Sequence, residues 1–260
     1  MSQQEFNAVA QRIIKARTEA CAVGPISADY PGFDLEDAYA IQQQVNRDRL
    51  DKGGRITGYK IGLTSEIVQQ QLGVDQPDYG VLFADMERRS GELIDCSRLI
   101  APKAEGEIGF VFKNDLDLKD LTFTEMLVEI ECFMPVVEIV DSVVKDWKIN
   151  IVDTVSDNAS SALYLVGERR FDPAGMDFGR LSVSIEAPGM NTLRGTGAAC
   201  LGNPLNATYW LARKLIELGT PIRKGHLVLS GAMAPMVNIQ PGMKLKFNFD
   251  QLGELVLNAG

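Results

Sequence analysis

The chain has 260 residues, of which 26 are Lys or Arg and 35 are Asp or Glu, so its formal charge is −9. An acidic surface repels phosphate backbones and anionic headgroups, and no long basic cluster offsets it, so we expect neither nucleic acid nor a membrane as a partner. The length allows one large domain or two small ones, with a substantial core in either case.

The first third of the chain is predicted to be helical. Its N-terminal 20 residues contain no continuous apolar segment that could serve as an export signal, and no stretch of the chain approaches the ~18 apolar residues of a membrane span. The apolar residues here fall on one side of an amphipathic helix: Phe6, Val9, Ile13 and Ile14. A second helix is expected from Asp34, which can cap it, with Asp37 in the first turn. A third is expected over residues 65–73, ending at Gly73.

After residue 80 the pattern changes to short apolar runs, several with strand-like alternation. These runs lie at residues 80–86, 107–112, 134–144, 181–187, 226–231 and 244–249. Two predicted helices interrupt them. One covers residues 121–133 and opens with a capping box of Thr122 and Glu125, and the other covers residues 203–219 with Asn203 as its cap.

This order of elements predicts an α+β fold. We expect a helical N-terminal region, residues 1–80, packed on a mixed β-sheet body, residues 81–260, the two forming one structural unit. The four cysteines are far apart and form no CxxC pair. In a chain without an export signal they indicate reduced thiols and a cytoplasmic protein, and we expect them to be buried as small hydrophobic residues. They are Cys21, Cys96, Cys132 and Cys200.

The stretch KAEGEIGFVF, residues 103–112, carries Glu105 and Glu107 into an otherwise apolar run. If this stretch is a strand, alternate side chains share a face. One face then holds Glu105, Glu107, Gly109 and Val111, and the other holds Ile108, Phe110 and Phe112. A lone pair of this kind is usually the solvated face of an edge strand, so the spacing alone does not indicate a site.

Glu138 changes this interpretation, because it lies in the apolar run MPVVEIVDSVV, where a lone buried carboxylate is costly. If it meets Glu105 and Glu107 within ~4 Å, each pair repels by about 4 kcal/mol at an effective dielectric of 20, so protons or a cation must be present. Three oxygen ligands suit Mg²⁺ or Mn²⁺. The single histidine, His226, is expected at a surface turn, which leaves neither a His-rich zinc site nor a Ser-His-Asp triad.

Seven motifs follow one another along the chain: GYKIGLTS, GVDQPDYG, KAEGEIGF, VVEIVDS, DTVSDNASS, GTGAACLGNPLN and LSGAM. In order and spacing this series resembles the 2-keto-4-pentenoate hydratase and 4-oxalocrotonate decarboxylase family, a branch of the fumarylacetoacetate hydrolase superfamily, over nearly the whole chain. The resemblance implies the fold of the fumarylacetoacetase C-terminal domain, a divalent metal on Glu105, Glu107 and Glu138, and a large homo-oligomer. Association with neighbouring pathway enzymes is a further expectation.

The resemblance also implies that Lys60 meets the substrate's carboxylate or the oxygen on its second carbon, and that Ser160 contacts substrate. From spacing alone, Lys60 reads as a snorkelling surface residue and Ser160 as a turn-capping serine. The glycines of GTGAACLG are expected to allow tight packing before the helix at Pro204, and not to form a phosphate loop.

The expected reaction is the metal-dependent addition of water to a 2-hydroxy-2,4-dienoate, giving a 4-hydroxy-2-oxo acid in aromatic meta-cleavage catabolism. Asp78 of QPDYG is the candidate proton-transfer group, against the alternative of a turn aspartate. The rival functions are a 4-oxalocrotonate decarboxylase with the same metal site and a non-catalytic partner subunit. Two departures from the resembled proteins stand out: the ending DQLGELVLNAG supplies no C-terminal arginine, and the sole histidine is not placed as in the hydrolases.

Overall fold

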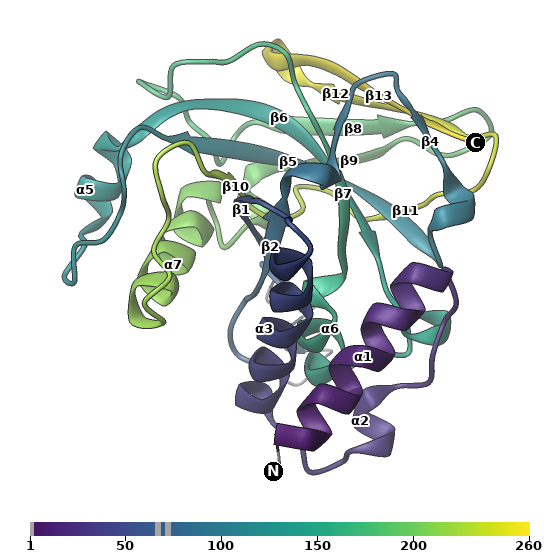
Figure 1. Ribbon diagram of the computed structural model, residues 1–260. Coiled ribbons are helices and arrows are strands. Elements are labelled where there is room, and N and C mark those ends of the chain that lie inside the picture. Colours follow the sequence, from purple (N-terminus) through teal and green to yellow (C-terminus); the bar gives the residue numbers. More distant parts are fainter. Residues whose placement is uncertain (1–2, 66–68, 71–73) are drawn as a thin grey trace.

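The computed structural model describes residues 3–65, 69–70 and 74–260. Its helices gather on two sides of curved β-sheets (Figure 1). The helices are α1 (Gln3–Glu19), α2 (Ile26–Asp29), α3 (Leu35–Asp51), α5 (Phe123–Val128), α6 (Ile151–Ser156) and α7 (Pro204–Glu217). In Figure 1, α1, α2, α3 and α6 lie together on one side, and α5 and α7 lie on the other. No helix in the described ranges is long and apolar enough to cross a membrane.

Among the described residues, the larger sheet has eight strands, in the order β2-β1-β10-β5-β6-β7-β3 with β11 also paired to β5. The pairs β1–β10 and β3–β7 are parallel and the others antiparallel, so the sheet is mixed. Its strands are β1 (Ile56–Gly62), β2 (Asp78–Phe83), β3 (Glu87–Arg89), β5 (Pro102–Phe112), β6 (Ile130–Asp141), β7 (Ser161–Val166), β10 (Leu227–Leu229) and β11 (Val237–Asn238).

In the part of the chain that the structure describes, a second sheet has five strands in the order β4-β13-β12-β8-β9. They are β4 (Leu93–Ile94), β8 (Ser182–Glu186), β9 (Leu193–Thr196), β12 (Lys244–Phe249) and β13 (Gly253–Ala259). The expected α+β class and the fold of mixed sheets with a helical N-terminal part are therefore confirmed.

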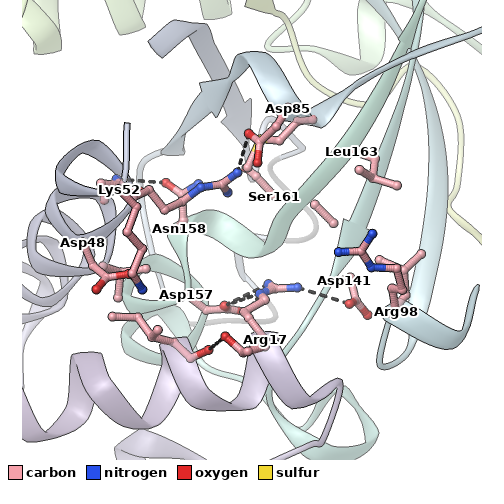
Figure 2. A pocket seen from close by; sticks show the side chains of 18 of the residues that line it. Arg17, Asp48, Lys52, Asp85, Arg98, Asp141, Asp157, Asn158, Ser161 and Leu163 are labelled. Atoms are coloured by element: carbon pink, nitrogen blue, oxygen red, sulfur yellow. Dashed lines mark hydrogen bonds and ion pairs between the residues drawn. The ribbon is translucent and has the colours of Figure 1, made fainter. Parts of the chain in front are cut away.

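The helical N-terminal part is shorter than the predicted 1–80. The long helices end at Asp51, and both β1 and β2 belong to the larger sheet. The helices α1, α3 and α6 share a hydrophobic cluster separate from the core of the sheets, and this cluster buries Val9 and Ile13 of the predicted amphipathic face. At the edge of this helical part Arg17 of α1 reaches the sheet and pairs with Asp141 and Asp157 (Figure 2).

Local signals placed most helix starts correctly. The Asp34–Asp37 box caps α3, Thr122–Glu125 caps α5, and Asn203 caps α7. The helix predicted over residues 121–133 is wrong in its second half, because α5 ends at Val128 and residues from Ile130 onward join β6. There Ile130 pairs with Phe112 of β5, so strand pairing overrides the helical periodicity. The helix predicted over residues 65–73 falls largely outside the described residues.

Candidate active site

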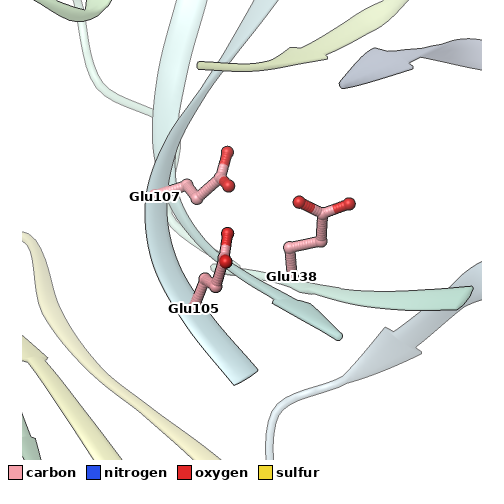
Figure 3. A group of neighbouring side chains, drawn as sticks. All are labelled: Glu105, Glu107 and Glu138. Carbon is pink, nitrogen blue, oxygen red and sulfur yellow. The ribbon is translucent and has the colours of Figure 1, made fainter. Parts of the chain in front are cut away.

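Three glutamates converge on one face of the larger sheet (Figure 3). Glu105 and Glu107 alternate along β5, and Glu138 of β6 lies directly opposite Glu105 in the register of the two strands. A carboxylate oxygen from each residue lies within 4.8 Å of those of the other two. Glu107 and Glu138 are fully buried, and Glu105 is half-buried. The predicted convergence of these carboxylates is present.

The protein's own hydrogen bonds do not satisfy this cluster. Glu107 Oε2 accepts a 2.7 Å hydrogen bond from the Gly231 N–H. Glu107 Oε1 and both oxygens of Glu138 accept none from the described residues. Burial, followed by the charge of Glu138, raises the pKa of Glu105 to about 7 and that of Glu107 well above its usual value. Bare, mutually repelling carboxylates in the interior fit a bound cation.

Lys60 lies beside the glutamates and not at the surface. It projects from β1, is only 4% exposed, and places its Nζ 3.5 Å from Glu138 Oε1. Burial alone would lower the pKa of Lys60, but the carboxylates of Glu138, Asp78 and Glu105 outweigh it and raise that pKa. The ammonium group is therefore charged, and the alternative of a snorkelling surface lysine does not hold.

Asp78 is the first residue of β2 and faces Gly62 of β1. A Cβ atom at position 62 would lie 2.2 Å from Asp78 Oδ1 and 3.4 Å from Lys60 Nζ, so the glycine leaves the space that both charged groups border. Burial raises the pKa of Asp78, and the charge of Lys60 opposes this rise. Asp78 is 2% exposed and begins a buried strand, so it is not a turn aspartate.

Ser160 ends a run of three buried residues, 158–160, that all adopt positive φ angles of 54°, 51° and 54°. This conformation is disfavoured for residues with a Cβ and persists only where the surroundings enforce it. Here the Asn158 side chain bonds both backbone groups of Val81, at 2.8 and 2.9 Å. Ser160 is 2% exposed, and its Oγ has no hydrogen-bond partner among the described residues.

Four of these residues line one cavity of about 700 Å³, and Glu107 and Glu138 are not part of its lining. Its polar lining includes Lys60, Asp78, Glu105 and Ser160, together with Thr64, Ser65, Thr154 and Arg194. Its apolar lining includes Val140, Trp147, Ile149, Pro235 and Met236. Trp147 and Arg194 were not predicted as site residues. Trp147 lies between the VVEIVDS and DTVSDNASS motifs and Arg194 directly precedes GTGAACLGNPLN, so the signal in the sequence was their proximity to these motifs.

Three other features of the sequence were given structural and not catalytic interpretations: the single histidine, the glycine-rich segment and the cysteines. His226 is not among the lining residues; it is half-buried and stacks edge-on against Tyr59. The glycine-rich GTGAACLG segment is tightly packed, because a Cβ on Gly195 or Gly197 would lie about 2 Å from the carbonyl oxygens of Met233 or Phe178. The cysteines are free thiols, but only Cys132 and Cys200 are buried; Cys96 is half-buried and Cys21 exposed, which corrects the expectation for that residue.

Comparison with known proteins agrees with this geometry. No family model matches the chain. A 2-keto-4-pentenoate hydratase of Paraburkholderia xenovorans LB400 is 43% identical over 255 residues, covering 98% of this chain and 95% of the relative.

Two solved structures are also similar. A 4-oxalocrotonate decarboxylase from Pseudomonas putida G7, complexed with magnesium and adipate, superposes over 100% of this chain and 99% of its own, with a TM-score of 0.96 and 32% identity. A fumarylpyruvate hydrolase from Pseudomonas aeruginosa, in complex with Mn²⁺ and pyruvate, covers 79% of this chain and 89% of its own, with a TM-score of 0.61 at 14% identity, and so shares the fold. The chain therefore belongs to the family of 2-keto-4-pentenoate hydratases and 4-oxalocrotonate decarboxylases.

Proposed function

We propose that this protein is a divalent-metal-dependent hydratase that converts a 2-hydroxy-2,4-dienoate into a 4-hydroxy-2-oxo acid in the meta-cleavage catabolism of aromatic compounds. The observation that carries the proposal is the convergence of three glutamates next to the buried Lys60, at a cavity lined by Lys60, Asp78 and Glu105. Two of these glutamates, Glu107 and Glu138, are fully buried with oxygens that accept no hydrogen bond from the described residues. The 43% identity to a hydratase over nearly the whole chain supports the reaction type.

Glu105, Glu107 and Glu138 are the proposed ligands of Mg²⁺ or Mn²⁺. Three oxygens of Glu107 and Glu138 accept no hydrogen bond from the described residues, and the pKa values of Glu105 and Glu107 are raised. Both features fit a hard cation that accepts carboxylate ligands and retains positions for a substrate. A cation bound there would act as a Lewis acid toward the carboxylate and 2-oxygen of the substrate.

Lys60 and Asp78 are the proposed catalytic residues. The Lys60 ammonium neutralises the anionic acid and the charge that develops on its 2-oxygen, and this stabilisation operates in a site shielded from water. Asp78 has a raised pKa and lies beside Lys60, so it can hold a proton and exchange it with the far end of the diene or with the attacking water. Ser160 is proposed to bind substrate through its unpartnered hydroxyl.

Decarboxylation is the nearest alternative, because the solved structure with a TM-score of 0.96 is a 4-oxalocrotonate decarboxylase. The test incubates the enzyme with matched 2-hydroxydienoates and 4-oxalocrotonate, following the loss of dienol absorbance, the release of carbon dioxide and the formation of hydroxy acid. We expect hydration, and its loss in Asp78→Asn with retained metal binding. The matched control is Asp75→Asn, an exposed aspartate of the same segment. Stoichiometric carbon dioxide without hydrated product would overturn the assignment.

The proposal extends to a homo-oligomeric cytoplasmic enzyme. Leu93, Leu118 and Val128 are more than half exposed, which is compatible with burial between subunits, and the free thiols fit a reducing compartment. Association with neighbouring pathway enzymes is part of the same proposal. Light scattering at micromolar concentration should give a mass well above 28.5 kDa, and a monomer would refute the oligomer. A partner that only scaffolds another enzyme would show no saturable metal binding.

A further inference from the structure

Trp147 forms part of the cavity wall in a backbone conformation that large residues rarely adopt. Its φ angle is 54°, and that of the preceding Asp146 is 59°. Two successive left-handed residues without glycine are unfavourable, and such strain is concentrated at ligand sites, where the surrounding structure holds it in place. The position of this indole therefore needs an explanation beyond local propensity.

Two contacts fix the indole over the start of β5. The Trp147 Nε1–H donates a 2.8 Å hydrogen bond to the Ala101 carbonyl. The Lys103 ammonium lies 4.1 Å from the ring centroid, a cation–π contact. Lys103 itself does not line the cavity, whereas Trp147 does. The ring is thus held between a bonded edge and a cation, and it presents the rest of its apolar surface to the cavity.

The register of β5 and β6 places this wall next to the glutamates. Glu105 faces Glu138, and two residues earlier on the same face Lys103 faces Val140. Two residues along a strand span about 7 Å. The cavity lining therefore changes from the Glu105 carboxylate to the apolar Val140 within one step of the ladder, and Trp147 lies at this same step through its contact with Lys103.

The rest of the cavity lining combines further apolar residues with the charged Arg194. Ile149 follows Trp147 by two residues, and Pro235 and Met236 come from the segment before β11. Met236 is 44% exposed, which places it toward solvent. An acid that is held by its first two carbons at the glutamates can direct its remaining carbons along this surface.

We infer that Trp147 is a specificity-determining residue, whose indole forms the wall against which the distal carbons of the substrate pack. The inference rests on the proposed function, since it takes the glutamate cluster as the end that holds the acid. A wall of this kind favours an unbranched acid with a short apolar tail.

The test measures binding and needs no turnover. Pyruvate, 2-oxobutanoate, 2-oxopentanoate and 2-oxohexanoate are titrated calorimetrically into the Mg²⁺-loaded protein. Each buried methylene should tighten binding by up to about fourfold in the wild type. In Trp147→Ala this gain per methylene should fall toward onefold, while pyruvate, which has no tail, binds as in the wild type. Trp147→Phe should retain most of the gain.

Trp210→Phe is the matched control, because Trp210 is the chain's other tryptophan and lies on α7 outside the cavity lining. It should leave the whole series unchanged. An unaltered gain per methylene in Trp147→Ala would overturn the inference, and so would an equal loss of affinity for pyruvate, which would indicate a structural role. If the wild type binds the series but hydrates no dienoate, the proposed function fails and the inference about Trp147 stands.

Discussion

The segment from Asp157 to Ser161 lines two cavities, each beside a cluster of buried charge. The two clusters differ in how well their carboxylates are hydrogen-bonded. In the first, each oxygen of Asp141 and Asp157 accepts at least one hydrogen bond, from Arg17 or from backbone N–H groups of residues 100, 101 and 143. In the second, Glu107 has one hydrogen-bonded oxygen and Glu138 has none from the described residues.

This difference in hydrogen bonding indicates that the first cluster stabilises the fold and the second binds a ligand. A buried ionic group whose lone pairs are all used holds elements together, here α1 against the end of β6 and the start of the 157–161 segment. A buried group that leaves its oxygens bare lowers stability unless something else binds there. A second cavity of about 450 Å³ adjoins the Arg17 cluster (Figure 2), so the presence of a cavity alone does not distinguish the two.

Glu107→Gln should have the largest effect on activity and no destabilising effect on the fold. The amide can still accept the Gly231 N–H bond, while one buried negative charge is removed. We expect hydratase activity to fall by at least about 10²–10³-fold, the loss typical of removing one electrostatic stabiliser. The free energy of unfolding of the metal-free protein, from urea titration, should be equal or higher. A marked loss of stability would place Glu107 with the structural cluster.

Arg17→Met should show the reverse. It leaves Asp141 and Asp157 buried without their cation, and breaking a buried ion pair costs about 3–5 kcal/mol. Metal affinity should change little. The matched control on the same helix is Arg12→Met, whose partner Asp29 is exposed and whose ion pair is worth about 0–1 kcal/mol. Equal destabilisation by both variants would contradict the contrast between the clusters.

Lys60→Ala removes the cation of the functional cluster. We expect a loss of about 3–4 kcal/mol of transition-state stabilisation, measured as kcat/KM, with a folded protein and metal binding retained. Wild-type kinetics in this variant would remove Lys60 from the mechanism.

The stability of the metal-free protein should depend on pH in the direction set by its raised carboxyl pKa values. Burial raises the pKa of Glu105 to about 7 and that of Asp157 to about 6. The folded state thus holds protons that the unfolded state releases near pH 4–4.5, so stability falls as pH rises from about 4.5 to 7. Burial lowers the pKa of His226, so this residue makes stability rise with pH. It is a single, half-buried group, and its effect is smaller than that of the carboxylates.

Thermal unfolding of the chelated protein at pH 5, 6 and 7.5 measures this dependence. Mg²⁺ should abolish the fall in melting temperature between pH 6 and 7.5, because a bound cation takes the place of the protons on the glutamates. A melting temperature of the metal-free protein that rises over this interval would show that the carboxylates are already satisfied.

The sequence was most informative where local periodicity decides the outcome. Alternation along β5 placed Glu105 and Glu107 on one face, and the apolar neighbours of Glu138 indicated that its carboxylate is buried. The convergence of all three required the pairing of β5 with β6, which the motif series implied but spacing alone did not.

Long-range and strained features could not be read in this way. Arg17 meets Asp157 across 140 positions of the chain. The left-handed backbone at Trp147, Ala159 and Ser160 involves residue types that ordinarily avoid it, so no local propensity indicates it. The end of α5 was predicted wrongly because residues from Ile130 onward pair with β5, and this long-range pairing sets their conformation.

The central claim is that the three glutamates form one site for a divalent cation. Calorimetric titration of the chelated wild type with Mn²⁺ tests it most directly, beside Arg17→Met and Glu107→Gln. We predict one saturable ion per chain in the wild type and in Arg17→Met, with binding lost or strongly weakened in Glu107→Gln. Unchanged binding in Glu107→Gln, or no saturable binding in the wild type, would contradict the account.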